Sequence, residues 1–130
     1  MSYSNTKTPI SRASTLDAFT TLINTLDAAA APHELTSPQL RLLFALGAHS
    51  GPLEQVELYK YTQVGRTANS RNVAKLGAGV RPSIKRGLGW LEAFEDVDNR
   101  KKNLVRLTPL GSRVLNNALD EANRFLFREE

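Results

Sequence analysis

The chain has 130 residues, 41% of them hydrophobic and 23% charged, as expected for one globular domain. It contains no cysteine, which excludes disulfides, thiolate metal sites and cysteine nucleophiles. No apolar run approaches the roughly 20 residues that cross a bilayer, and the polar start, residues 1–13, lacks the apolar core of a signal peptide. We therefore expect a soluble cytoplasmic protein with a flexible N-terminal segment.

Positive charge is concentrated in the middle of the chain. Residues 60–106 hold eleven Lys or Arg against four acids, a net +7, so the rest of the chain carries −3 of the total of +4. No Asp or Glu occurs between Glu57 and Glu92. Such a surface favours a polyanionic partner, the alternative being a solvated basic face.

Three helices are predicted in the first half. Residues 14–31 have apolar side chains at helical spacing after a capping Ser14 or Thr15. The second helix is predicted to have Ser37 as its cap and Pro38 in its first turn. Residues 52–62 predict a third, short helix.

The stretch "ANSRNVAKLGAGVRPSIKRGLGWLEAF" predicts a helix, a turn at Gly77 and Gly79, and a second helix over about residues 81–91. This spacing suits a helix-turn-helix motif, in which the second helix reads the nucleic acid. Two further glycines inside that helix lower its stability by roughly 1 kcal/mol each relative to alanine.

A hairpin and a long helix complete the chain. Residues 93–98 and 103–109 predict short strands, and the cationic sequence "DNRKK" forms the tip between them. We expect this hairpin to be a wing. Thr108 then caps a final helix over residues 109–127, which has a long apolar stripe.

Residues 37–115 resemble the MarR family of winged-helix transcription regulators, whose wing carries an Asp and an Arg and runs into an "LT..G" turn. The matching residues here are Asp98, Arg100, Leu107, Thr108 and Gly111. The resemblance implies a mainly α-helical fold with a small β-hairpin: a winged helix-turn-helix domain over residues 14–130 with its core at 37–108. It also implies that the helices at 14–31 and 109–127 form a homodimer interface.

One departure from the family is the long path between Leu58 and Arg81. Either "TANSRNVAKL" is an extra helix ahead of the recognition helix, or it is the first helix of the helix-turn-helix motif and "PLEQVELYK" is the addition. In both interpretations, the helix after Gly79 is the reader.

On this basis the helix at 81–91 enters the major groove, and the wing at 98–103 lies on the adjacent minor groove. We expect Asp98 to orient Arg100. The predicted DNA-binding residues are Arg71, Lys75, Arg81, Ser83, Lys85, Arg86, Arg100, Lys101, Lys102 and Asn103.

The predicted function is a homodimeric, sequence-specific regulator of transcription that binds double-stranded DNA, with repression favoured. The alternatives are a nucleic-acid-binding accessory protein of replication, partition or packaging, and a winged-helix module that binds proteins. His33 and His49 show no metal-ligand or catalytic spacing, so we expect no enzyme, metal or cofactor. No residue set identifies a small-molecule effector.

Overall fold

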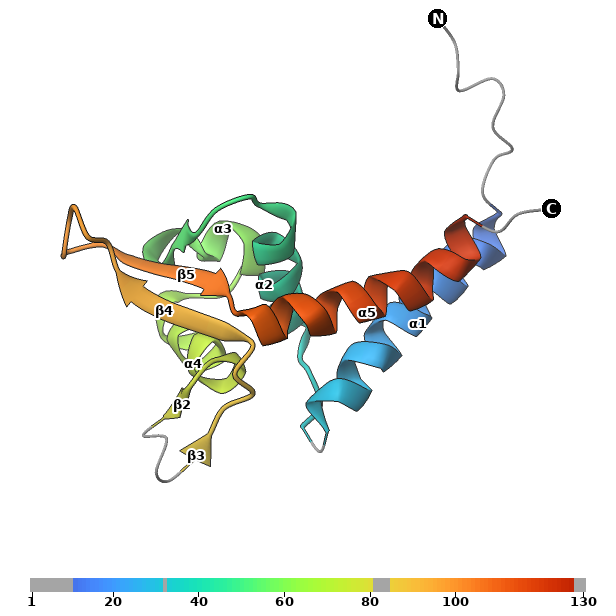
Figure 1. Cartoon of the computed structure of the whole chain (residues 1–130), viewed down its shortest axis with the longest axis horizontal. Helices are drawn as coiled ribbons and strands as arrows, with labels where there is room; N and C mark the ends of the chain where they lie inside the picture. The colour runs from blue at the N-terminus through green and yellow to red at the C-terminus, as the bar shows by residue number, and fades with distance from the viewer. Residues whose placement is uncertain (1–10, 32, 81–84, 128–130) are drawn as a thin grey trace, which may run out of the picture.

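The computed structural model describes residues 11–31, 33–80 and 85–127, and consists mainly of helices with two small antiparallel sheets (Figure 1). The helices are α1 (Arg12–Ala30), α2 (Ser37–Ala48), the single 3-10 turn η2 (Gln55–Glu57), α3 (Tyr59–Thr62), α4 (Arg66–Leu76) and α5 (Pro109–Leu126). The strands are β1 (Leu53–Glu54), β2 (Gly79–Val80), β3 (Lys85–Arg86), β4 (Leu91–Glu95) and β5 (Asn103–Leu107). The larger sheet has the order β1-β5-β4, and β2 pairs only with β3.

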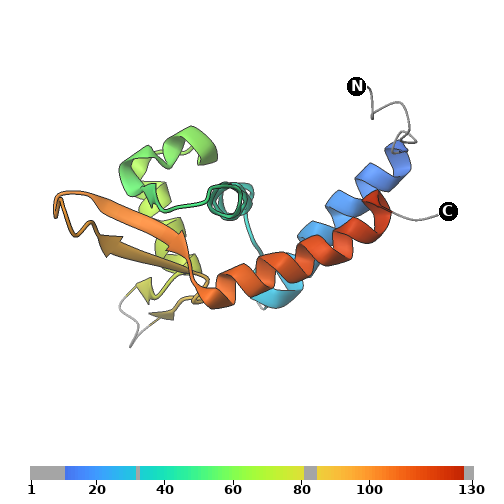
Figure 2. The ribbon, with the colours of Figure 1, turned by 45° about the horizontal axis from the view of Figure 1, so that its top comes forward.

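Helices α1 and α5 lie side by side and extend together away from the rest of the chain (Figures 1 and 2). The buried residues along them include Ala18, Leu26, Leu115, Ala118 and Ala122, and the small alanine side chains allow the two backbones to approach closely. Helix α1 begins before the predicted Ser14 because the side chain of Ser11 accepts a hydrogen bond from the backbone N–H of Ser14, at 3.0 Å.

In the winged core, α2 and α4 pack against the larger sheet, and α3 packs against α2 and α4. The buried cluster of this core consists of Ala30, Leu42, Leu43, Leu46, Leu58, Val73, Leu76, Trp90, Leu91 and Val105. Helix α2 is held at its start by a capping box, in which Thr36 and Gln39 exchange side-chain to backbone hydrogen bonds. The predicted third helix is divided between β1, the 3-10 turn and α3, since Leu53 and Glu54 pair with β5.

The wing is confirmed as strands β4 and β5, with Ala93 opposite Val105. Its tip is closed by hydrogen bonds from the N–H of Asp96 to the carbonyl of Lys102, at 3.0 Å, and from the N–H of Lys102 to the carbonyl of Asn99, at 2.9 Å. These bonds fix the cationic tip at the far end of the sheet (Figure 1).

Hydrogen bonding and close packing explain why Thr108 and Gly111 occupy their positions in the "LT..G" turn. Thr108 caps α5 by accepting a hydrogen bond from the N–H of Gly111, at 3.0 Å, and donates its hydroxyl proton to the carbonyl of Gly89, at 2.6 Å. A side chain at Gly111 would collide with the backbone of Trp90, whose carbonyl carbon would lie 2.9 Å from the added Cβ. The motif therefore locks the start of α5 onto the segment that leads into the wing.

The predicted helix at 81–91 is wrong. Lys85 and Arg86 form strand β3, strand β4 begins at Leu91, and residues 81–84 lie outside the described part of the chain. The physical reason lies in the glycines: Gly89 has φ +75°, and Gly87 contacts the backbone at the end of α4 where a Cβ would not fit. The backbone is thereby directed into a hairpin.

The structure also changes both interpretations of the long path between Leu58 and Arg81, because each of them made the helix after Gly79 the reader. The sequence "TANSRNVAKL" lies in α4, and α4 follows α3 directly. The helix-turn-helix motif is therefore α3–α4, with its turn at residues 63–65, and the β2–β3 hairpin takes up chain length between this motif and the wing.

Candidate nucleic-acid interface

The turn between α3 and α4 is fixed by a buried asparagine. Asn69 is 2% exposed; its side-chain oxygen accepts from the hydroxyl of Thr62 at 2.8 Å, and its amide donates to the carbonyl of Val64 at 3.2 Å. Gln63 takes a left-handed conformation with φ 62°, which reverses the chain between the two helices. These contacts set the angle at which α4 leaves α3.

Helix α4 has one buried face and one polar exposed face. Asn69, Val73 and Leu76 point into the core, as their helical spacing requires. The opposite face exposes Arg66, Thr67, Ser70 and Arg71, followed by the partly exposed Ala74. Of these, only Arg71 was among the predicted DNA-binding residues.

The sequence contains only a weak indication that Arg66, Thr67 and Ser70 lie on the exposed face of a helix. Only Val73 and Leu76 are buried apolar side chains on α4, so hydrophobic periodicity does not mark the helix strongly. The third buried position is Asn69, which fixes the α3–α4 turn through hydrogen bonds with Thr62 and Val64. A local sequence pattern does not reveal these contacts.

Lys75 is on α4 but is directed at the linker between α1 and α2. Its ammonium donates to the carbonyl of Glu34 at 3.2 Å and lies 3.5 Å from the side-chain oxygen of Gln39. The amide of Gln39, in turn, donates to the side-chain oxygen of Asn72 at 3.2 Å. Lys75 therefore helps to hold α4 against the α1–α2 linker.

The wing presents two cations without carboxylate partners in the described part of the chain, Arg100 and Lys101, both exposed. The expected Asp98–Arg100 pair is not among the ion pairs of the described residues. The N–H of Asp98 instead donates to the carboxylate of Asp96, at 2.9 Å.

Lys102 lies beside these cations but pairs with Glu54 of β1, at 3.1 Å. The hydrogen bond to Glu54 raises the pKa of Lys102 above its ordinary value of 10.5. Asn103, the first residue of β5, is exposed and pairs with Glu95 across the wing.

Of the remaining predicted residues, Lys85 and Arg86 form strand β3, which follows α4 and β2. Arg86 is exposed on β3 beside Lys85, whereas Arg81 and Ser83 lie outside the described residues. The structure thus brings α4, the hairpin and the wing into one half of the molecule, away from the free ends of α1 and α5 (Figures 1 and 2).

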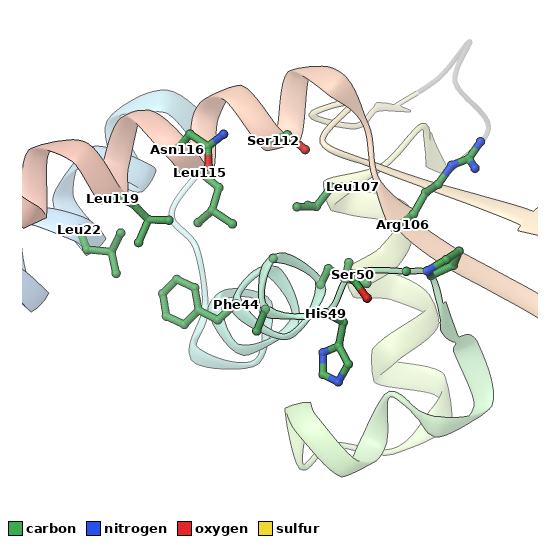
Figure 3. A pocket seen from close by; sticks show the side chains of 15 residues that line it. Leu22, Phe44, His49, Ser50, Arg106, Leu107, Ser112, Leu115, Asn116 and Leu119 are labelled. Carbon is green, nitrogen blue, oxygen red and sulfur yellow. The ribbon is translucent and has the colours of Figure 1, made fainter. Parts of the chain in front are cut away.

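A hollow of about 690 Å³ lies between α1, α2, α5 and β5 (Figure 3). Leu22, Phe44, Leu115 and Leu119 give it an apolar wall. Polar groups at its lining come from His49, Ser50, Arg106, Ser112 and Asn116. No cluster of His, Asp or Glu able to hold a metal occurs within residues 11–31, 33–80 and 85–127, and no helix in those ranges is long and apolar enough to cross a membrane.

No protein-family model and no curated protein matches the sequence. Solved structures do match. The PcaV transcriptional regulator from Streptomyces coelicolor, in complex with its natural ligand, is 29% identical over 78% of this chain, with a TM-score of 0.54. This chain spans 64% of the PcaV chain. A mutant of MarR from E. coli, complexed with operator DNA, is 21% identical over 84% of this chain and 71% of its own, with a TM-score of 0.56.

The fold is that of the MarR-family transcription regulators. YusO from Bacillus subtilis also matches, at 16% identity over 88% of this chain and 72% of its own, with a TM-score of 0.59. The predicted winged helix-turn-helix architecture is confirmed. The expectation that the chain is not an enzyme agrees with the MarR-like neighbours, which are transcription regulators.

Proposed function

We propose that this MarR-like chain is a homodimeric transcription regulator, with repression its favoured mode, that recognises double-stranded DNA by sequence. Helix α4 enters the major groove, and the wing, residues 98–103, lies on the adjacent minor groove. The observation that carries the proposal is the exposed face of α4, which presents Arg66, Thr67, Ser70 and Arg71 on a helix that contains no Asp or Glu.

The chemistry of this face suits a groove. Arg71 provides the planar donor pair that guanine accepts at its major-groove edge, which makes it the candidate base reader. Arg66 stands at the start of α4, whose cap residue Gly65 makes no side-chain hydrogen bond to the first turn. The free N–H groups of that turn, together with Arg66, favour a phosphate.

The wing supplies charge to the neighbouring groove. Arg100 and Lys101 are exposed at its tip, and the narrow minor groove attracts such cations through its negative potential. Lys102 supports the tip through Glu54, so we assign it mainly to holding the wing in place.

The α1–α5 pair supports dimerisation. Its exposed apolar side chains are Leu16, Phe19, Ile23, Leu110 and Leu119, and Phe19 is 57% exposed. A second copy of the chain would cover this surface by a two-fold contact and set two α4 helices against a pseudo-palindromic site. Sedimentation at micromolar concentration should give a dimer, and a monomer throughout that range would contradict this part of the proposal.

The binding test is fluorescence anisotropy of a labelled random-sequence duplex at several salt concentrations. Arg66, Arg100 and Lys101 from two protomers give six phosphate contacts, so the slope of log K against log [salt] should be at least as steep as about −5. Single-stranded DNA and double-stranded RNA of equal length serve as comparisons. Equal affinity for all three, or no duplex binding at low salt, would contradict the proposal.

The hollow of Figure 3 supports a second proposal, that a small organic molecule regulates the chain. Its volume is in the range of small-molecule sites, and apolar walls with a few polar groups at the edge are usual there. The neighbour PcaV was solved with its natural ligand. A ligand for this hollow should raise the Tm of the wild type and raise it less in Phe44→Ala. Equal shifts in both proteins would place the ligand elsewhere.

A further inference from the structure

The β2–β3 hairpin projects from the end of α4 and is separate from the wing (Figure 1). Gly79 pairs with Arg86, and Val80 pairs with Lys85. Residues 81–84, which join the two strands, lie outside the described residues. The two described strands are therefore the part of the hairpin whose position relative to α4 is known.

The base of the hairpin is tied to the carboxyl end of α4. The N–H groups of Leu88, Gly89 and Trp90 donate to the carbonyls of Lys75, Gly77 and Leu76, at 3.0, 2.9 and 2.7 Å. Carbonyls at the end of a helix have no partner within the helix, so these bonds satisfy groups that would otherwise need water. The hairpin base consequently follows the orientation of α4.

The contact with α4 also defines where the hairpin starts. A Cβ added to Gly87 would lie 2.7 Å from the carbonyl oxygen of Ala74 and from the nitrogen of Gly79, so only glycine permits this approach. Ala74 continues the row of Ser70 and Arg71 on the exposed face of α4 at helical spacing. The hairpin therefore begins at the carboxyl end of the exposed face of α4.

Arg86 makes the hairpin cationic. It is exposed, and it has no carboxylate partner among the ion pairs of the described residues. The sequence around it has no Asp or Glu from residue 58 to residue 91, so no acid close in the chain neutralises it. A polyanion is the partner that this charge fits.

The length of α4, compared with the width of the major groove, indicates which part of the DNA lies near the hairpin. The 11 residues of α4 span about 16 Å at about 1.5 Å each, whereas the major groove is only about 12 Å wide. With Arg66 at a phosphate on one edge of the groove and Arg71 at the bases, the carboxyl end of α4 reaches the opposite edge, which is also lined by phosphates. We infer that the β2–β3 hairpin is a second wing, in which Arg86 binds a backbone phosphate of duplex DNA beyond the end of α4.

This inference rests on the proposed binding of duplex DNA by α4, but it differs from the sequence-based expectation for Arg86. A base reader on a recognition helix would affect the preferred site most. A phosphate contact carries no sequence information and affects all duplexes alike.

The experiment measures salt slopes of full-length Arg86→Ala, Arg86→Lys and Arg12→Ala on the preferred and on a random duplex. Arg12 is exposed and is the first residue of α1, and that end of α1 lies far from the hairpin in Figure 1, so Arg12→Ala serves as the matched control. Arg86→Ala should flatten the slope by about two units for a dimer, equally on both duplexes, since each protomer loses one contact. Arg86→Lys should keep the wild-type slope, because a contact with one phosphate requires a positive charge and not the two parallel N–H donors of an arginine side chain.

The outcomes separate the two proposals. If the wild type binds duplex DNA and Arg71→Ala weakens it, but Arg86→Ala keeps the wild-type slope, the second wing is overturned while the function stands. A loss confined to the preferred duplex, or failure of Arg86→Lys to restore the slope, would overturn the phosphate assignment. If the wild type does not bind duplex DNA, the function itself fails.

Discussion

Replacing Asn69 with alanine tests whether the α3–α4 turn holds the reading helix in place. The substitution removes the acceptor for the hydroxyl of Thr62 and the donor to the carbonyl of Val64. Thr62 can turn its proton to the carbonyl of Leu58, 3.1 Å away, so the carbonyl of Val64 is the group that loses its side-chain donor. Leaving the part-buried carbonyl of Val64 without its side-chain donor costs about 1 to 3 kcal/mol.

For a chain of this size, 1 kcal/mol corresponds to roughly 3 to 5 °C in Tm, so Asn69→Ala should melt roughly 3 to 15 °C below the wild type. The matched control is Ser70→Ala, the next residue on the exposed face, which should stay within about 0.5 kcal/mol. Calorimetry or circular dichroism measures both. At a temperature where all three proteins are folded, Asn69→Ala should also bind duplex DNA less tightly.

The reasoning would be refuted if Asn69→Ala melted no lower than Ser70→Ala. If the stability of Asn69→Ala fell as expected while its DNA affinity stayed equal to that of the wild type, the turn would stabilise the fold without positioning α4 for DNA binding.

Three further predictions concern the wing, the dimer and the hairpin. Lys101→Ala should flatten the salt slope of a dimer by about two units, whereas Lys102→Ala should flatten it less because Lys102 is paired with Glu54; equal changes would show that the pair opens on binding. Phe19→Asp should convert the dimer into a monomer in sedimentation, since it places a charge in an apolar contact, and a retained dimer would place the interface elsewhere. Gly87→Ala should lower the Tm through backbone collision, and an unchanged Tm would show that the hairpin base can move.

The elements predicted correctly from the sequence are those marked by patterns of neighbouring residues, such as helix caps, apolar stripes and strand-like runs. Thr108 and its following proline mark the start of α5, and the apolar stripe marks its length. The wing was equally visible, because two short strand-like runs flank a polar turn. The apolar stripes of residues 14–31 and 109–127 led to the prediction of a homodimer interface, whereas the packing of α1 against α5 within one chain came only from the structure.

The sequence placed the reading helix at residues 81–91, where no helix is found at residues 85–91, because the features that mark α4 as the proposed reading helix come from tertiary contacts. Strands β2 and β3 are two residues each, too short for an alternating pattern. Gly77 and Gly79 also resemble the turn of a helix-turn-helix motif, whereas the real turn at Gln63 has a non-glycine residue in the left-handed region. The role of Lys75 depends on Glu34, 41 residues away, which no local pattern reveals.

The most direct test of the account is selection of bound sites from random duplexes by the wild type, Arg71→Ala and Arg86→Ala. If α4 reads the major groove, Arg71→Ala should lose the preference at one position in each half-site, while Arg86→Ala selects the wild-type sequence with lower affinity. An unchanged preference for Arg71→Ala, together with a lost position for Arg86→Ala, would contradict the placement of α4 as the reading helix.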